Sequence, residues 1–454
     1  MAKVYTFQTF EEEKAAGQLT DFVQDFVRQH ESSEPVRLAK QADLYDKWQN
    51  PGAESFSRAY ADMLKRLSKG MQQTMRPDMV KSNLFRKLNV QRAAYSLGNG
   101  VMFAEDGVKD KLGKRFDETL FTAGYYALIH GESFVWWNKD HITVYKLDEF
   151  APLYDEETGA LRAGVRYWQH NPDTPIHYTL YEADGYTEYT YNKKTCKVEE
   201  TAGKRHYIVT TVTTDEGGLD DMLGENYGSL PIVPLWGSDL HQSTLVGLKA
   251  YIDNMDLVMS GFCNDLQDCA QIYWLVENFG GMTDQDLQEF LARMNLYHIA
   301  SADTEQGGKV APYTTEIPVT ARQTLLQLLH ERAYEDFGGL DVHCVSADST
   351  NDHLDAAYEP LNHNADDFEK QLIVCIQQIA EIAGIGKVSP IFNRSKIVNT
   401  AEQVSMVLSE AAIIGAEAAI DLLPNIDPEM KEQIKKNLLA ERAQMEVTTE
   451  DEDE

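Results

Sequence analysis

The sequence is that of a long, acidic chain, and its charge excludes general affinity for nucleic acids. It has 454 residues, of which 43% are hydrophobic, and 41 Lys and Arg against 73 Asp and Glu give a net charge of −32. This length supports a real core and two or three domains. A protein that grips DNA along its whole surface needs a basic footprint that displaces counterions. The composition fits a soluble surface, or one that stays near a polyanion without holding it.

The chain has no segment typical of secretion or of membrane insertion. Its wholly apolar runs are short, and no N-terminal stretch combines an apolar core with a cleavage site. Five cysteines are scattered without a CxxC pair. We therefore expect no disulfide framework, and a protein that works in the cytoplasm or in something assembled there.

Helices are expected before residue 131. Residues from Phe10 to Met79 are charged and helical in pattern, most clearly in Leu19–Val27 and Phe56–Leu67. Further helices are predicted within Lys81–Phe103 and over Asp117–Ile129.

Residues 131–236 change to an alternating pattern rich in Tyr and Thr, which predicts a mostly antiparallel sheet. Its last element, Leu230–Trp236, contains two prolines and therefore suits an edge strand. The other predicted strands are Ser133–Trp137, His141–Lys146, Gly164–Trp168, His177–Glu182, Gly185–Tyr191 and His206–Thr213.

The most informative stretch is Ser243–Asn278, which predicts one long helix of roughly 50 Å. Apolar and semi-polar residues recur in alternating steps of three and four, the period of a helix that lies along another helix. Compact single domains rarely need such a helix, whereas assemblies that line a channel do. The seam consists of Leu245, Leu248, Ile252, Met255, Met259, Phe262, Leu266, Cys269 and Tyr273. The broadly opposite side carries Asp253, Asp256, Asp265 and Asp268.

The remaining elements are mostly helical. Leu340–Asp355 is polar and irregular in pattern, and Pro360 marks the first turn or a kink of the helix that follows. The acidic end EDEDE has no reason to fold. The predicted helices are Thr283–Leu296, Thr320–Phe337, Leu361–Ala383, Thr400–Ile414 and Pro428–Gln444.

Motifs for catalysis are absent from the sequence. It contains no Walker loop, no GxGxxG after a strand, no HExxH and no GxSxG. The strongest metal or catalytic candidate combines His343, Cys344, His353 and His363 with nearby acidic residues, but the spacing fits no compact site. The acidic residues of this group are Asp348, Asp352, Asp355, Asp366 and Asp367.

Two further groups have a structural explanation that we favour. Asp284, Asp286 and Glu289 fall in a predicted first helical turn, where carboxylates complement the helix dipole. An aromatic group fits the core of a helix-to-sheet junction better than a ligand pocket: Tyr125, Tyr126, Phe134, Trp136 and Trp137. We therefore predict no enzyme, no cofactor and no metal, and a structural assembly protein instead.

Four segments in this order resemble one family. They are AAYSLGNGVMF, then AGYYALIHGESFVWWN, then LPIVPLWGSD leading into LKAYIDNMDLVMSGFCNDLQDCAQIYWLVENFGG, and IIGAEAAIDLLPNIDPEMKEQIKKNLLAE near the C-terminus. Together they resemble the portal proteins of tailed double-stranded DNA phages, siphophage type, from about Lys81 to Ala443. The chain departs from the family pattern at Ser349–His353, where a Ser-Gly turn is expected, and at Gly415, where many relatives have serine.

The resemblance implies an α+β, portal-like fold with an antiparallel-sheet wing, long stem helices, a small α/β clip and a helical crown. The implied division is residues 1–242 wing, 243–278 first stem helix, 279–319 clip, 320–339 second stem helix, 340–355 tunnel loop, 356–386 wing-spanning helix, 387–447 crown and 448–454 disordered acidic tail.

The resemblance also implies the function. Portal proteins form a ring, typically of twelve subunits, at one capsid vertex, through which double-stranded DNA is packaged and ejected without sequence specificity. Implied partners are further copies of the chain, the terminase motor, major capsid and scaffolding proteins, and a head-completion or adaptor protein, with no membrane. The chain would be assembled in the host cytoplasm and reside in the virion.

Site residues follow from the same resemblance. The helix seam from Leu245 to Leu266 would be a subunit contact. Asp253, Asp256 and Asp268 would face the channel, or alternatively solvent or Arg and Lys of a neighbouring subunit. The tunnel loop would present Asp341, Asp348, Ser349, Thr350, Asn351 and Asp352. The rival interpretations are another virion connector or adaptor, and a metal-dependent enzyme that uses His343, His353 and His363.

Overall fold

The computed structural model divides the chain into two compact units. Unit 1 comprises Met1–Ala42, Lys87–Thr244 and Asp336–Glu454, and unit 2 comprises Asp43–Arg86 and Leu245–Glu335. Unit 2 thus takes residues 43–86 from the segment that the sequence assigned to the wing. The structure describes residues 4–52, 79–213, 219–269, 273–277, 309–313, 318–341, 351–394 and the single stretches 409, 420, 430–431 and 433–437.

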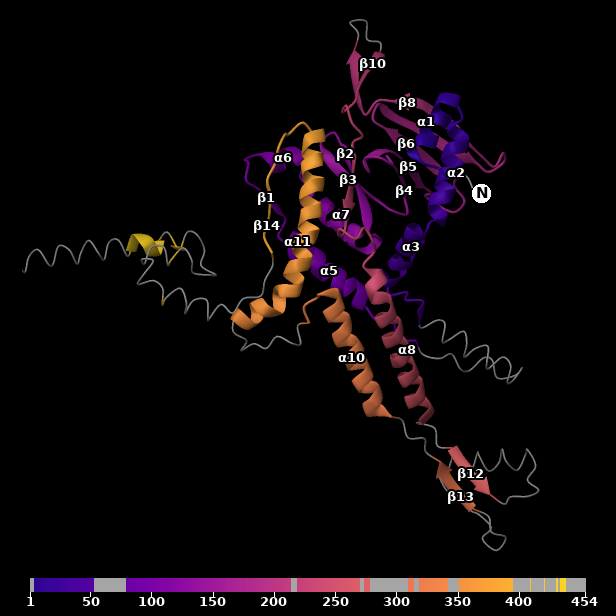
Figure 1. Ribbon diagram of the computed structural model, residues 1–454, viewed down its shortest axis with the longest axis vertical. Coiled ribbons are helices and arrows are strands. Elements are labelled where there is room, and N and C mark those ends of the chain that lie inside the picture. Colours follow the sequence, from indigo (N-terminus) through magenta and orange to yellow (C-terminus); the bar gives the residue numbers. More distant parts are fainter. Residues whose placement is uncertain are drawn as a thin grey trace, which may run out of the picture. The chain divides into compact units, whose positions relative to one another are not determined.

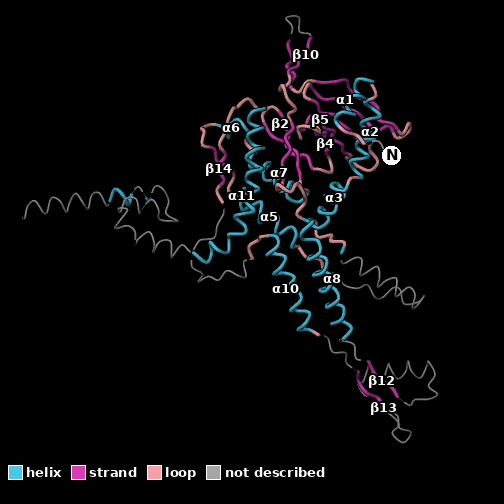
Figure 2. Tube along the Cα trace, in the orientation of Figure 1, coloured by secondary structure: helices cyan, strands magenta, loops and turns pink. Residues whose placement is uncertain are grey.

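Unit 1 combines helices with most of the described strands (Figure 2). Its N-terminal helix α1 starts in a capping box, in which Thr6 and Thr9 exchange side-chain to backbone hydrogen bonds, and it ends at Gly17 with φ 72°. The helices of this unit are α1 (Phe7–Ala16), α2 (Leu19–Ser32), most of α3 (Glu34–Asp46) and of α5 (Leu84–Leu97), α6 (Val108–Leu112), α7 (Phe116–His130) and α11 (Asn351–Ile382).

A five-stranded antiparallel sheet forms the larger β layer, in the order β4-β5-β6-β7-β8. Helices α1 and α2 cover it, because Phe10, Phe22 and Phe26 share a core with Leu153, Val165 and other inward residues of the sheet. The strands are β4 (Phe150–Tyr154), β5 (Leu161–Trp168), β6 (His177–Glu182), β7 (Gly185–Asn192) and β8 (Lys197–Arg205).

A second antiparallel sheet has the order β11-β2-β3, formed by β2 (Glu132–Asn138), β3 (His141–Lys146) and β11 (Ile232–Trp236). Strand β11 lies at an edge, as the two prolines predicted. The antiparallel character of residues 131–236 is confirmed. Phe134 is fully buried, and Trp137 and Tyr125 nearly so, which agrees with the core interpretation of the aromatic group.

Two short antiparallel pairs complete the strands of unit 1. One joins β9 (Ile208–Thr213) to β10 (Leu219–Glu225), and the other joins β1 (Val101–Phe103) to β14 (Pro390–Phe392). The second pair brings residues next to α5 together with residues that follow α11.

The segment that leads out of α10 (Val319–Phe337) is held by side chains of unit 1. Asn364 donates to the backbone oxygen of Phe337 at 2.8 Å. Gln91 bonds both backbone groups of Leu340, accepting from its N–H at 3.0 Å and donating to its oxygen at 2.9 Å. The chain is therefore fixed in place just before residues 342–350.

Helix α11 begins ten residues earlier than the sequence predicted. It runs from Asn351 to Ile382 with Pro360 inside it, whereas we expected a helix that starts at Leu361. Packing explains the difference, because Tyr358, Leu361 and Ala365, on both sides of the proline, share one buried cluster with Tyr95 and Leu340. The burial of both sides outweighs the hydrogen bond that proline removes.

Unit 2 contains two long helices, α8 (Leu245–Cys269) and most of α10, and a strand pair formed by β12 (Tyr273–Glu277) and β13 (Lys309–Tyr313). The prediction of one helix over Ser243–Asn278 is wrong at its C-terminal end, since Tyr273–Glu277 is a strand. Aromatic and β-branched residues in YWLVE favour a strand once a partner is available, and Lys309–Tyr313 supplies it. Helix α8 is therefore about 37 Å long.

Other expectations lie outside the described residues. These are the helices at Phe56–Leu67 and Thr283–Leu296, most of those at Thr400–Ile414 and Pro428–Gln444, and the acidic tail.

Candidate assembly surface on the α8–α10 hairpin

Helices α8 and α10 run side by side and form the largest described feature of unit 2 (Figure 1). An ion pair between Asp265 of α8 and Arg322 of α10 connects them. The same guanidinium lies over the ring of Phe262, 5.6 Å from its centroid. The pairing places α10 against the C-terminal half of α8 within one chain.

The predicted seam on α8 is largely buried within the chain itself. Leu245, Leu248, Ile252 and Met255 are between 0% and 8% exposed. Met259 and Phe262 are half-buried, and Leu266 is 49% exposed. The first four residues are therefore not available to a neighbouring subunit in this structure, and the seam is mainly an internal packing face. The 3–4 period indicates a packing face, but it does not say which chain supplies the partner.

Leucines that the sequence analysis did not select are exposed instead. Leu325 and Leu328 of α10 are 42% and 49% exposed, and Leu257 of α8 is 36% exposed. The signal was present in LLQLL at residues 325–329, because its four leucines spread over an arc of about 160° of the helix. One neighbouring helix covers only part of so wide an arc: Leu326 and Leu329 are half-buried, whereas Leu325 and Leu328 are exposed.

The acidic side of α8 is also occupied by unit 2 itself. Asp256 is 1% exposed. It accepts hydrogen bonds from the side-chain amide of Asn50 at 2.6 Å and from the backbone N–H of Ser82 at 2.9 Å. One turn further on, the Ser260 hydroxyl accepts from the N–H of Val80 at 3.0 Å. The expectation that Asp256 faces a channel is therefore wrong for this chain.

Asp253 lies one turn before Asp256 and is partly accessible, with 22% of its side chain exposed. It accepts a hydrogen bond from the Tyr45 hydroxyl and forms an ion pair with Lys249 at 2.7 Å. A Cβ on Gly52 would come within 2.3 Å of its carboxylate, so a larger residue there would have to displace the Asp253 side chain. Residues 45–52 and 79–82 thus meet on one face of α8.

Burial shifts the pKa values of the polar residues on this face of α8. It raises the pKa of Asp256 above its ordinary value, and the hydrogen bonds from Asn50 and Ser82 oppose the rise. Burial likewise raises the pKa of the Tyr45 hydroxyl, with the Asp253 carboxylate adding to the effect. Tyr45 consequently remains a donor to Asp253.

The tunnel-loop residues are placed only in part. Asp341 is half-buried at the end of the linker from α10, while Asp348, Ser349 and Thr350 lie outside the described residues. Asn351 and Asp352 are the first residues of α11, which corrects their assignment to an irregular loop. Asp268 belongs to α8, and its side chain is not among those described.

The described members of the candidate metal group do not form one cluster. His353 and His363 are ten residues apart on α11, a helical rise of about 15 Å. Asp366 instead binds Arg394. Among the described side chains there is no cluster of three or more His, Cys, Asp or Glu suited to a metal ion. His343, Cys344 and the Asp284, Asp286 and Glu289 group lie outside the described residues.

Among the described helices, none is both long enough and apolar enough to cross a bilayer.

These observations define a mixed helix-and-sheet protein in which two long helices, α8 and α10, lie side by side. A protein-family model described as "Phage portal protein, SPP1 Gp6-like" matches residues 40–444. This match spans most of the sequence, and the chain therefore belongs to the phage portal protein family.

Two individual proteins are similar to parts of the chain. The portal protein of Clostridium phage phiCD119 is 38% identical over 117 residues, which make up 25% of this chain and 25% of that relative. A solved structure titled "Neck of empty GTA particle computed with C6 symmetry" is 10% identical with a TM-score of 0.43, over 76% of this chain and 89% of that chain.

Proposed function

We propose that copies of this chain close into a ring at one vertex of a phage capsid, and that the ring is the channel for packaging and ejection of double-stranded DNA. Membership of the portal family supports this function. The observation that carries the ring is the outward apolar face of the α8–α10 hairpin. The protein acts by assembly and not by catalysis, and it resides in the virion after assembly in the host cytoplasm.

The hairpin is two-sided, which is the property that a ring subunit needs. Leu325 and Leu328 lie one helical turn apart on α10 and leave large apolar surfaces in solvent. Leu257 likewise leaves apolar surface exposed on α8, on the side of the helix opposite the seam. Contact between the α10 face of one copy and the α8 face of the next is heterologous, and such contacts generate closed rings when the rotation between copies allows it. We expect about twelve copies.

The proposed division follows the structure where it differs from the sequence. Helices α8 and α10 form the stem, the chain between them forms the clip, and unit 1 supplies the wing. The tunnel loop shortens to about residues 341–350, since α11 begins at Asn351. Residues 387–447 form the crown. The clip docks the terminase and later a head-completion protein, and the wing contacts capsid and scaffolding proteins.

A charge placed on the outward leucines tests the ring. We expect Leu325→Glu with Leu328→Glu to give folded single subunits, because two buried carboxylates at each contact oppose association. Leu240→Glu is the matched control, since Leu240 is 69% exposed in a loop of unit 1. Light scattering after gel filtration and negative-stain images measure the outcome. Intact rings with a central hole in the double variant would contradict the proposal.

A connector or adaptor role is the second candidate, and the same images address it. A metal-dependent enzyme has no support from the described residues, and elemental analysis of the purified chain tests it directly.

A further inference from the structure

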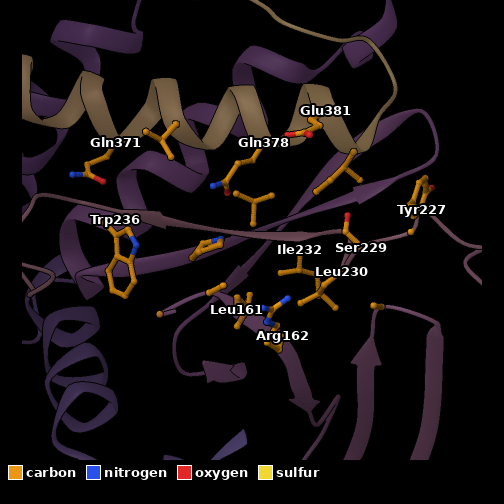
Figure 3. Close-up of a pocket in the computed structure, with 18 residues that line it drawn as sticks. Leu161, Arg162, Tyr227, Ser229, Leu230, Ile232, Trp236, Gln371, Gln378 and Glu381 are labelled. Carbon is orange, nitrogen blue, oxygen red and sulfur yellow. The ribbon is translucent and has the colours of Figure 1, made fainter. Parts of the chain in front are cut away.

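A groove runs along strand β11 in unit 1, with a volume of about 750 Å³ (Figure 3). Strand β11 forms its floor. Helix α11 forms one wall through Gln371, Val374 and Gln378, and the start of strand β5 forms the other through Leu161 and Arg162. The groove is thus a sheet edge between a helix and the start of another strand.

The hydrogen bonds of β11 identify which backbone groups face the groove. Trp137 donates to the oxygen of Pro231, and Gly237 donates to the oxygen of Gly131. In this register the odd-numbered residues of β11 bond to β2, so Ile232, Pro234 and Trp236 point their backbone groups outward. No described residue supplies a backbone partner for these outward groups. The edge therefore offers three acceptors but only two donors.

Pro234 decides what kind of strand fits. It occupies the central outward position, where it removes the middle donor of the edge. If two copies of β11 paired about a two-fold axis, the N–H that Pro234 lacks would be missing from both strands, and their backbone hydrogen bonds would be incomplete. A different extended strand, whose own N–H groups meet the three carbonyls, is the better complement.

The side chains of the groove give the strand a direction and a charge. Trp236 marks one end, stacked on His241 with ring centroids 3.8 Å apart. Glu381 lies toward the other end (Figure 3). Arg162 is already paired with Asp155 at 3.3 Å. Glu381 forms no ion pair with another described residue, so the uncompensated charge of the groove is negative.

We propose that this groove binds an extended segment of another protein, which adds as a strand to the outer edge of β11 and places a Lys or Arg at the Glu381 end. Two amide side chains, Gln371 and Gln378, face the added backbone from α11, and Val374 supplies an apolar contact. The net charge of −32 favours a basic partner over a second copy of the chain. This inference goes beyond the proposed ring and does not depend on it.

Amide hydrogen exchange at single residues of the full-length chain tests the proposal. Without a partner, the N–H groups of Ile232 and Trp236 should exchange faster than those of Val233 and Leu235. The probe is a capped hexapeptide of alternating Thr and Val that ends in Lys, since five strand residues span about 17 Å. At five times its Kd, the peptide should slow exchange at Ile232 and Trp236 about sixfold and leave Val233 and Leu235 unchanged.

Matched variants separate the groove from nonspecific binding. Val374→Glu should abolish the protection, whereas Val246→Glu, at an equally exposed valine of α8, should not; the two valines are 52% and 51% exposed. Glu381→Gln should weaken the Lys peptide but not the same peptide with a terminal Thr. Absence of protection at millimolar peptide overturns the proposal. Protection of Ile232 and Trp236 that rises with the concentration of the chain alone overturns it in favour of a second copy.

Discussion

The carboxylate of Asp256 lies 2.6 Å from the side-chain amide nitrogen of Asn50, although 206 residues separate them in the sequence. The same carboxylate accepts from the backbone N–H of Ser82, and Asn50 also donates to the Ser82 oxygen at 3.1 Å. Residues 50 and 82, which flank residues 53–78, are therefore fastened to one point on α8. Asp256 is a structural residue of unit 2, and its chemistry governs the first prediction.

Asp256 should make the stability of unit 2 depend on pH. Its pKa in the folded chain is raised above 3.8, so the folded state binds the proton more tightly than the unfolded state does. The free energy of unfolding should therefore fall as pH rises from about 4 through the raised pKa. We expect Asp256→Asn to remove this fall, as measured by urea unfolding between about pH 4 and pH 7.

Asp265→Asn is the control on the same helix, because Asp265 is partly exposed in its pair with Arg322. An unchanged pH slope in the Asp256 variant would show that another group titrates. Asp256→Ala should destabilise unit 2 at all pH values, since it leaves the donor groups of Asn50 and Ser82 without an acceptor, at a cost of about 1–3 kcal/mol each.

Glu132 should be a second source of pH dependence, this time in unit 1. Its side chain is 6% exposed, it accepts from the Tyr154 hydroxyl, and burial raises its pKa well above the ordinary value. Stability should again fall as pH rises above about 4.5. Glu132→Gln keeps an acceptor for Tyr154 without the charge, so we expect a higher melting temperature at pH 8 and little change at pH 4.

Glu188→Gln on β7 provides the comparison for Glu132, since its carboxylate is 42% exposed beside Arg205. We expect no gain at pH 8 from that change. An equal rise in melting temperature for both variants would point to the net charge of the chain and not to burial.

Gly338 should be sensitive to any side chain. Its φ is 66°, and a Cβ there would lie 2.4 Å from the side-chain nitrogen of Asn364. Gly338→Ala should cost about 1–2 kcal/mol for the left-handed backbone and about 1 kcal/mol more for the displaced bond from Asn364 to Phe337. Chemical denaturation measures the loss.

A double variant separates the two causes at Gly338. Asn364→Ala removes both the clash and the hydrogen bond, so Gly338→Ala with Asn364→Ala should cost less than the sum of the single changes. Strict additivity would mean that the backbone strain acts alone.

A substitution at Asp253 tests whether an acidic face of α8 lines the channel, because Asp253 is the one of the three candidate aspartates whose described side chain is partly exposed. Asp253→Asn removes the charge while its oxygen can accept from Tyr45, so rings should form normally. If the Asp253 carboxylate repels DNA phosphates in the channel, the variant should hold DNA more tightly and package it more slowly at low salt. Added salt should restore the rate, because it screens the attraction between DNA and basic groups of the channel. Packaging at the normal rate in low salt would contradict a role for this carboxylate in the channel.

The sequence by itself determined the antiparallel region at residues 131–236, the edge position of Leu230–Trp236 and the helix at Thr320–Phe337, because these rest on local period and on proline. The order of the four motifs resembles that of the portal family, and this resemblance requires no knowledge of the fold. These signals are local or are carried by sequence similarity, so they survive without knowledge of contacts.

Only the tertiary structure decided which faces are internal. The seam of α8 and Asp256 looked like assembly and channel surfaces, yet Leu245, Ile252 and Asp256 are buried within the chain. The strand at Tyr273–Glu277 and the early start of α11 likewise depend on partners distant in sequence, namely Lys309–Tyr313 and the cluster around Tyr95. An amphipathic pattern records that a face is covered; what covers it depends on contacts between residues far apart in the chain, and these the pattern does not encode.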